Sequence, residues 1–122
     1  MWLCFNDAFL SVVANPADPA TLTVRARRKG DLEAVFGQQV EVLTLPGRDY
    51  QFRAFIPRRV VADTVAAELA GIDYGNFKDS VADAPLHDAY MKVWGVMANL
   101  QEIPPYGSEP RPGFNKHPVR GA

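Results

Sequence analysis

The chain has 122 residues, of which 48% are apolar and 22% are charged, and its formal net charge is −1. These values are those of one globular domain and exclude a disordered chain. The near-neutral charge disfavours a dedicated nucleic-acid binder, because such domains carry an overall basic excess, but a local basic surface is still allowed. Cys4 is the single cysteine, which excludes an internal disulfide.

The beginning of the chain lacks the basic segment and long apolar run of a secretory signal peptide. No apolar run approaches the roughly 20 residues that a membrane-spanning helix needs. We therefore expect a cytoplasmic protein without a membrane partner.

Two apolar segments come first, residues 2–5 and 9–14, with Asn6 and Asp7 between them. Asn and Asp tolerate the backbone geometry of tight turns, so the pair fits a hairpin. It fits a bend in one long strand equally well.

Residues 21–27 alternate apolar and polar side chains, which predicts a half-buried strand of an antiparallel sheet. Its apolar members point toward the core, and Arg25 and Arg27 point to the opposite side. Asp31 is the expected N-cap of a short helix over 32–36.

The same order of elements recurs in the next segment. Residues 40–45 and 50–56 are two expected strands, and Pro57 suits the first turn of a following helix that ends near Gly71. The second of these strands is expected to place one set of side chains on the same side: Tyr50, Phe52, Ala54 and Ile56. The helix is expected to face the core with Val61, Val65, Leu69 and Ile72.

Residues 9–36 and 40–71 therefore form two strand–strand–helix units. Two such units predict an α+β fold, with an antiparallel sheet of four to five strands and the helices packed on one face.

A long C-terminal helix is expected after Asp83, a plausible N-cap, and it should pack beside or across the two units. It should end near Gln101, because the prolines that follow cannot continue it. The residues expected in the core are one apolar stripe at helical spacing and two tryptophans: Leu86, Tyr90, Val93, Met97 and Leu100, with Trp94 and Trp2.

Half of the ten prolines lie after this helix. We therefore expect a single α+β domain over residues 1–101 and a proline-rich, extended C-terminal arm over 102–122. Tyr106 and Phe114 are the residues of the arm that can anchor it or contact a partner.

Four arginines are the first candidate binding residues: Arg25, Arg27, Arg28 and Arg53. Because Arg53 comes from the matching strand of the second unit, we expect it near Arg25 and Arg27. Such a group of charges can bind phosphates or an acidic protein surface. It can also be the solvated face of an antiparallel sheet, which is the more common case.

The polar loop over 73–83 supplies the second set of candidates, which are Asn76, Lys78 and Asp79. Polar residues on a connector held by a scaffold often form binding sites. The alternative is that Asn76 and Asp79 only bind free backbone groups at helix ends. Two histidines and one cysteine are too few for an ordinary zinc site, so we expect no metal and no cofactor.

The segments FLSVV, LTVRARRKGDLEAVF and NFKDSV with LHDAYMKVW are similar to those of small, uncharacterised proteobacterial proteins. The resemblance covers most of residues 2–100. It implies no activity and no functional residue.

No catalytic motif is present: there is no glycine-rich phosphate loop, GxSxG, HExxH or CxxC. The sequence therefore favours a small non-catalytic protein that binds a macromolecule, most simply another protein or a second copy of itself, as an adaptor or inhibitor. Nucleic-acid binding through the arginines is the first alternative. A small enzyme with its site in the 73–88 region, using Lys78, Asp79 or His87, is the second.

Overall fold

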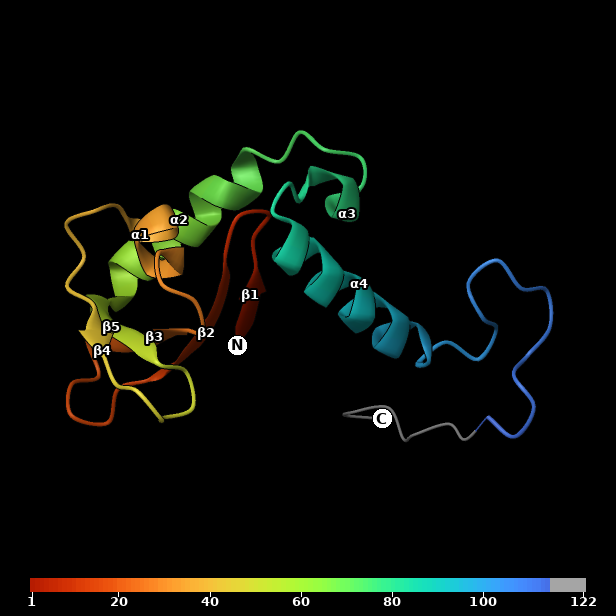
Figure 1. The fold of residues 1–122 in the computed structure, drawn as a ribbon, viewed down its shortest axis with the longest axis horizontal. Helices are drawn as coiled ribbons and strands as arrows, with labels where there is room; N and C mark the ends of the chain where they lie inside the picture. Colours follow the sequence, from red (N-terminus) through yellow and green to blue (C-terminus); the bar gives the residue numbers. More distant parts are fainter. Residues whose placement is uncertain (115–122) are drawn as a thin grey trace.

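The computed structural model describes residues 1–114, which contain a five-stranded antiparallel sheet in the order β1-β2-β3-β5-β4 (Figure 1). The strands are β1 (Trp2–Cys4), β2 (Phe9–Ala14), β3 (Thr21–Ala26), β4 (Leu43–Thr44) and β5 (Phe52–Pro57). The helices are α1 (Asp31–Phe36), α2 (Arg58–Ala70), α3 (Phe77–Ser80) and α4 (Ala84–Ala98). The expected α+β class is confirmed. The part of the expected arm over 115–122 lies outside the described residues.

The first two strands form the hairpin that was one of the two alternatives. Trp2 pairs with Ser11 and Cys4 with Phe9. The two strand–strand–helix units are also present, and β3 and β5, the second strand of each unit, pair at the centre of the sheet.

One face of the sheet carries the main hydrophobic core, and α1 and α2 cover this face (Figure 1). Strand alternation places apolar side chains of β2, β3 and β5 on it, and each helix adds one buried aliphatic residue. The buried members are Leu10, Val12, Val24, Ala26, Leu32, Ala54, Ile56 and Val61. Burial stabilises the fold by about 1.5–3 kcal/mol for each large aliphatic side chain.

The first half of α4 packs on the opposite face of the sheet. Phe9 faces away from the main core, because its neighbour Leu10 points into it. Phe9 packs instead against a second cluster formed by Val81, Leu86 and Tyr90. Asp83 is the N-cap, as expected, and its Oδ1 accepts a hydrogen bond from the Leu86 N–H at 3.0 Å.

The second half of α4 does not pack as expected, because it runs away from the sheet (Figure 1). Val93, Trp94, Met97 and Leu100 are 45%, 42%, 56% and 63% exposed, and Trp2 is 68% exposed. The helical period identifies the apolar side of a helix, but it does not reveal whether a neighbour covers it. The expectation that these residues lie in the core is therefore wrong.

The helix also ends earlier than expected, at Ala98 and not near Gln101. Beyond Ala98 the amides of Leu100 and Gln101 donate to carbonyls three residues back, those of Met97 and Ala98. This tighter turn is a common way for a helix to end.

Three further expectations about the second unit are corrected. β4 has only two residues, and Leu69 and Ile72, expected toward the core, are 65% and 49% exposed. Tyr50 does not share a side with Phe52, because its φ of 58° places it in the left-handed region and breaks the strand alternation. The Tyr50 ring lies instead against Arg25 and Arg27 on the other side of the sheet.

Asp31 is not the N-cap of α1. Gly30 holds that position, in the left-handed conformation that a glycine adopts at low cost. Asp31 is buried, and its carboxylate accepts hydrogen bonds from the Phe9 amide and from Arg28. The side chain therefore satisfies a strand amide and an arginine.

Candidate functional site

Arg28 joins α1 to α4. Its guanidinium donates to Asp31 at 3.1 Å and to Asp83 at 3.0 Å. The hydrogen bond from the Leu86 amide, together with Arg28, lowers the pKa of Asp83. Arg28 therefore positions the start of α4. Because its guanidinium already pairs with two carboxylates, it is less available to a ligand than the guanidinium groups of the other three candidate arginines.

Two of the other three arginines, Arg25 and Arg27, lie over one aromatic ring, and Arg53 pairs with Arg25 on the neighbouring strand. We call Arg25, Arg27, Arg53 and Tyr50 the arginine cluster. The guanidinium carbons of Arg25 and Arg27 lie 4.4 and 4.1 Å from the centre of the Tyr50 ring, which is 5% exposed. Arg53 lies directly opposite Arg25 in the β3–β5 pairing. The expected proximity of Arg25, Arg27 and Arg53 is confirmed.

The cluster has fewer acidic partners than charges. Arg27 pairs with Asp49 at 3.0 Å. In the described part of the chain, Arg25 donates only to the Ser11 hydroxyl and Arg53 only to the Asp49 backbone carbonyl. Within residues 1–114 neither Arg25 nor Arg53 has an ion pair, and the Nε atom of each is buried without a hydrogen-bond partner.

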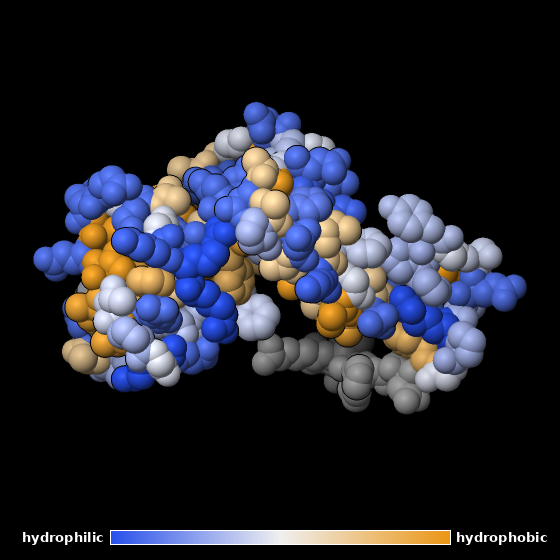
Figure 2. Space-filling model, viewed as in Figure 1, coloured by the Kyte–Doolittle hydropathy of each residue, from blue (hydrophilic) through white to orange (hydrophobic). Residues whose placement is uncertain are grey.

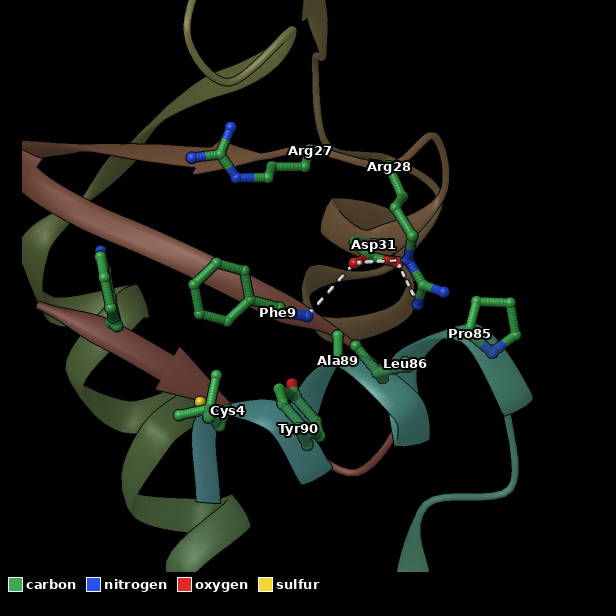
Figure 3. Close-up of a pocket in the computed structure, with 11 residues that line it drawn as sticks. Cys4, Phe9, Arg27, Arg28, Asp31, Pro85, Leu86, Ala89 and Tyr90 are labelled. Carbon is green, nitrogen blue, oxygen red and sulfur yellow. Dashed lines mark hydrogen bonds and ion pairs between the residues drawn. The ribbon is translucent and has the colours of Figure 1, made fainter. Parts of the chain in front are cut away.

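A groove of about 280 Å³ separates the open sheet face from the first half of α4 (Figure 3). Apolar side chains form most of it, and Arg27, Arg28 and Asp31 lie at one end. The residues that line its apolar part are Trp2, Cys4, Phe9, Pro85, Leu86, Ala89, Tyr90 and Val93. It is a recess suited to an apolar group.

Cys4 and Tyr90 meet in this groove, and their protonation argues against a nucleophile there. Burial raises the pKa of the Cys4 thiol, and it raises the pKa of Tyr90 well above its ordinary range. Both groups are therefore protonated near neutral pH, whereas a reactive cysteine is a thiolate. The Tyr90 hydroxyl bonds to the Phe5 and Ala8 carbonyl oxygens at 3.0 and 2.9 Å.

Two of the binding candidates of the 73–88 region, Asn76 and Lys78, line one groove together with Tyr106, whereas Asp79 does not line it. Asn76 is the N-cap of α3, because its side-chain oxygen accepts a hydrogen bond from the Asp79 amide at 3.4 Å. In the structure it therefore binds a free backbone group at a helix end, which was the alternative to a binding role. Lys78 lies 4.9 Å over the Trp94 ring, and Asp79 is exposed. His87 lies 3.8 Å from Asp88. Asp79 and His87 do not line the groove of Lys78, so it does not bring the three acid or base candidates together.

The described part of the arm returns to the end of α4. Arg111 donates to the carbonyl oxygens of Ala98 and Gln101, both at 3.1 Å, and so satisfies free acceptors at the helix end. Tyr106 is fully exposed and does not anchor the arm, while Phe114 is half-buried. The division into a domain over 1–101 and an arm remains a prediction.

A large apolar surface occupies the second half of α4. We call Val93, Trp94, Val96, Met97 and Leu100 the α4 surface; their exposed fractions run from 42% to 67%. Figure 2 shows apolar residues along this helix. A second groove of about 530 Å³ adjoins it, lined in part by Lys78, Trp94, Met97 and Tyr106. Cys4, Tyr90 and Val93 line both grooves, so the two grooves meet at these residues.

Residues 1–114 contain neither a metal-binding cluster nor a membrane-spanning helix. No group of three or more His, Cys, Asp or Glu side chains lies close enough to hold a metal ion. In the same part of the chain, every helix is too short or too polar to cross a membrane.

Sequence reasoning missed two residues of these sites. Tyr50 follows a turn-forming segment, and nothing in its local pattern reveals a left-handed backbone. Trp2 begins a strand that alternation alone cannot assign to the inner or outer face. Phe9 carried a usable signal, because its alternation with Leu10 places it on the face opposite the core.

Comparison of the chain with protein-family models, with curated proteins and with solved structures found no match in any of the three.

Proposed function

We propose that this protein is a non-catalytic binding module that recognises another protein through the α4 surface. The observation that supports the proposal is the exposure of five large apolar side chains, four on the second half of α4 and Leu100 in the turn that follows it. A helix that is apolar over so wide an arc is normally buried, and contiguous apolar patches on soluble proteins commonly mark interaction sites.

The composition of this surface suits a protein partner. Tryptophan and methionine are enriched at the centres of protein interfaces, and Trp94 and Met97 lie side by side on it. The grooves on either side of Val93 can accept apolar side chains of the partner. Lys78, over the Trp94 ring, adds a cation at the edge of the patch.

The region around α4 also favours binding over catalysis. Cys4 and Tyr90 are protonated, and Lys78 and His87, two of the candidate acids or bases, face different surroundings. A cytoplasmic location is part of the proposal.

Two charge-introducing variants test it, Trp94→Lys and Met97→Lys, with Gly95→Lys as the matched control. Gly95 is exposed on the same helix, and a Cβ atom added there would meet no other atom within 4 Å. Two residues turn a helix by roughly 200°, so Gly95 lies on the other side from both Val93 and Met97. We expect wild type and Gly95→Lys to recover the same protein from a nuclease-treated host lysate, and the two test variants to lose it.

Light scattering of the purified chain separates two kinds of partner. If the partner is a second copy, wild type and Gly95→Lys form dimers and the test variants are monomers. Equal recovery and equal mass for all four proteins would overturn the proposal, because the α4 surface would then contribute nothing.

A further inference from the structure

The arginine cluster contains an electrostatic imbalance that the proposed protein interface does not use. Arg25 and Arg53 face each other across β3 and β5, and neither has a carboxylate partner within residues 1–114. Like charges directly opposite in an antiparallel pair destabilise it. Half-burial increases this cost, because water then screens the two charges less.

The free hydrogen-bonding atoms of the two side chains are well defined. The Nη2 atom of Arg25 donates to Ser11 and that of Arg53 to the Asp49 carbonyl. Both Nε atoms are buried and unpartnered. The Nη1 atoms make no hydrogen bond within the described residues and are not among the buried atoms. They are therefore the donors that each arginine can offer to a ligand.

Tyr50 holds this arrangement at a conformational cost. A bulky residue at a φ of 58° is strained by about 1–2 kcal/mol. Its ring lies against Arg25 and Arg27, so the backbone is bent in a way that fixes those guanidinium groups in place. Backbone outliers of this kind are often found where a site must be held in a defined geometry.

We propose that Arg25 and Arg53 form a binding site for the phosphate group of a small organic phosphate. Within residues 1–114 the two arginines carry two positive charges without acidic partners, and a phosphate monoester carries −1.5 to −2 charges near neutral pH. Arginine is also the residue best suited to paired hydrogen bonds with phosphate oxygens. Arg27 is a lesser contributor because Asp49 already pairs with it.

The surroundings suggest a phosphate joined to an apolar or flat body. Phe55 follows Arg53 by two residues on the same face and is 50% exposed, and Leu43 lies opposite Arg53 and is 48% exposed. A nucleic acid is a poorer fit, since Arg28 is directed to Asp31 and Asp83. Too few cations then remain to follow a chain of phosphates.

The test is a titration of the full-length chain with phenyl phosphate at constant ionic strength, followed through the side-chain Nε–H signals and backbone amides by NMR. We expect saturable shifts at Arg25 and Arg53. Arg25→Gln and Arg53→Gln should each weaken binding at least tenfold, the loss expected for a charge-assisted contact. Arg59→Gln, an exposed arginine of α2, should leave it unchanged.

Benzoate at the same ionic strength is the second arm, since it keeps the ring and has a single carboxylate charge. Weaker binding of benzoate supports a phosphate site. Equal binding of benzoate, equal shifts for Arg59, or unchanged affinity in both glutamine variants would overturn the proposal. The backbone spectrum shows whether each variant is folded, and the α4 variants of the preceding section should bind phenyl phosphate normally.

Discussion

The hydroxyl of Tyr90 lies 2.9 Å from the carbonyl oxygen of Ala8, 82 residues earlier in the chain. It also reaches the Phe5 carbonyl oxygen at 3.0 Å, so one side chain of α4 holds both ends of the β1–β2 turn. Together with the Arg28–Asp83 ion pair, it fixes the first half of the helix to the sheet. The second half has no comparable contact with a strand, which is why the α4 surface is open.

We predict that Tyr90→Phe destabilises the protein by about 1–2 kcal/mol, because a largely buried hydrogen bond is lost with little change of volume. A loss of about 1 kcal/mol is expected if Ala8 is the main acceptor, because its carbonyl oxygen still accepts a hydrogen bond from the Phe5 amide in the variant. Urea denaturation measures the change. Tyr106→Phe is the matched control, because Tyr106 is fully exposed, and a similar loss in this control would contradict the assignment.

Leu10 gives the corresponding test of the main core. Its side chain is fully buried between β2 and the helices that cover it. We expect Leu10→Ala to lower the free energy of unfolding by about 2–5 kcal/mol, through lost burial and the cavity left behind. Val96→Ala, at a position 67% exposed, should change it by less than about 0.5 kcal/mol. Comparable effects at both positions would mean that the α4 surface is covered in the free protein.

The sheet was predictable because alternation is a local signal. The positions of Arg25 and Arg53 on the open face and of Leu10 and Val24 in the core follow from the period of two in each strand. The proximity of Arg25 and Arg53 follows from the repeated unit, since matching strands of two such units pair at the centre of the sheet. These parts needed no knowledge of distant contacts.

The candidate site was less predictable because it depends on what the sequence pattern does not encode. Trp94 and Met97 have the spacing of core residues, but they are exposed because the second half of α4 runs away from the sheet (Figure 1). Asp31 looks like a helix cap, but a strand amide and Arg28 compete for its carboxylate. Tyr50 reverses its expected side through one backbone angle.

Asp83 predicts a specific loss of stability in acid. Its folded-state pKa is lowered, so the ionised form is stabilised in the native protein relative to the unfolded chain. This contribution is complete above the ordinary aspartate pKa of about 3.9 and is lost as the pH falls through the lower folded-state pKa. We therefore expect stability to decline below about pH 4.

The variant Asp83→Asn isolates this effect, because asparagine can still cap α4 but carries no charge and cannot form an ion pair with Arg28. The difference in unfolding free energy between wild type and the variant should be largest at pH 7 and should shrink toward pH 3. Asp79→Asn, at an exposed position, serves as the control. A difference that stays constant over this range would exclude Asp83 as a source of the acid sensitivity.

Tyr50 allows two opposing effects to be compared. Replacement by glycine relieves about 1–2 kcal/mol of left-handed strain. It also removes a buried ring, worth about 1.5–3 kcal/mol, and two cation–π contacts of about 0.5–1 kcal/mol each. The losses are larger, so Tyr50→Gly should be destabilising by about 1–3 kcal/mol, whereas Tyr50→Phe should be within about 0.5 kcal/mol of wild type.

Thermal and urea unfolding of the two variants decide which effect dominates. If Tyr50→Gly is more stable than wild type, backbone strain outweighs the ring contacts, and Tyr50 then holds the arginines at a net cost. If Tyr50→Phe is also strongly destabilised, the hydroxyl contributes a contact beyond the ring. The expected order, with phenylalanine near wild type and glycine below it, would assign the stabilisation to the buried ring against Arg25 and Arg27.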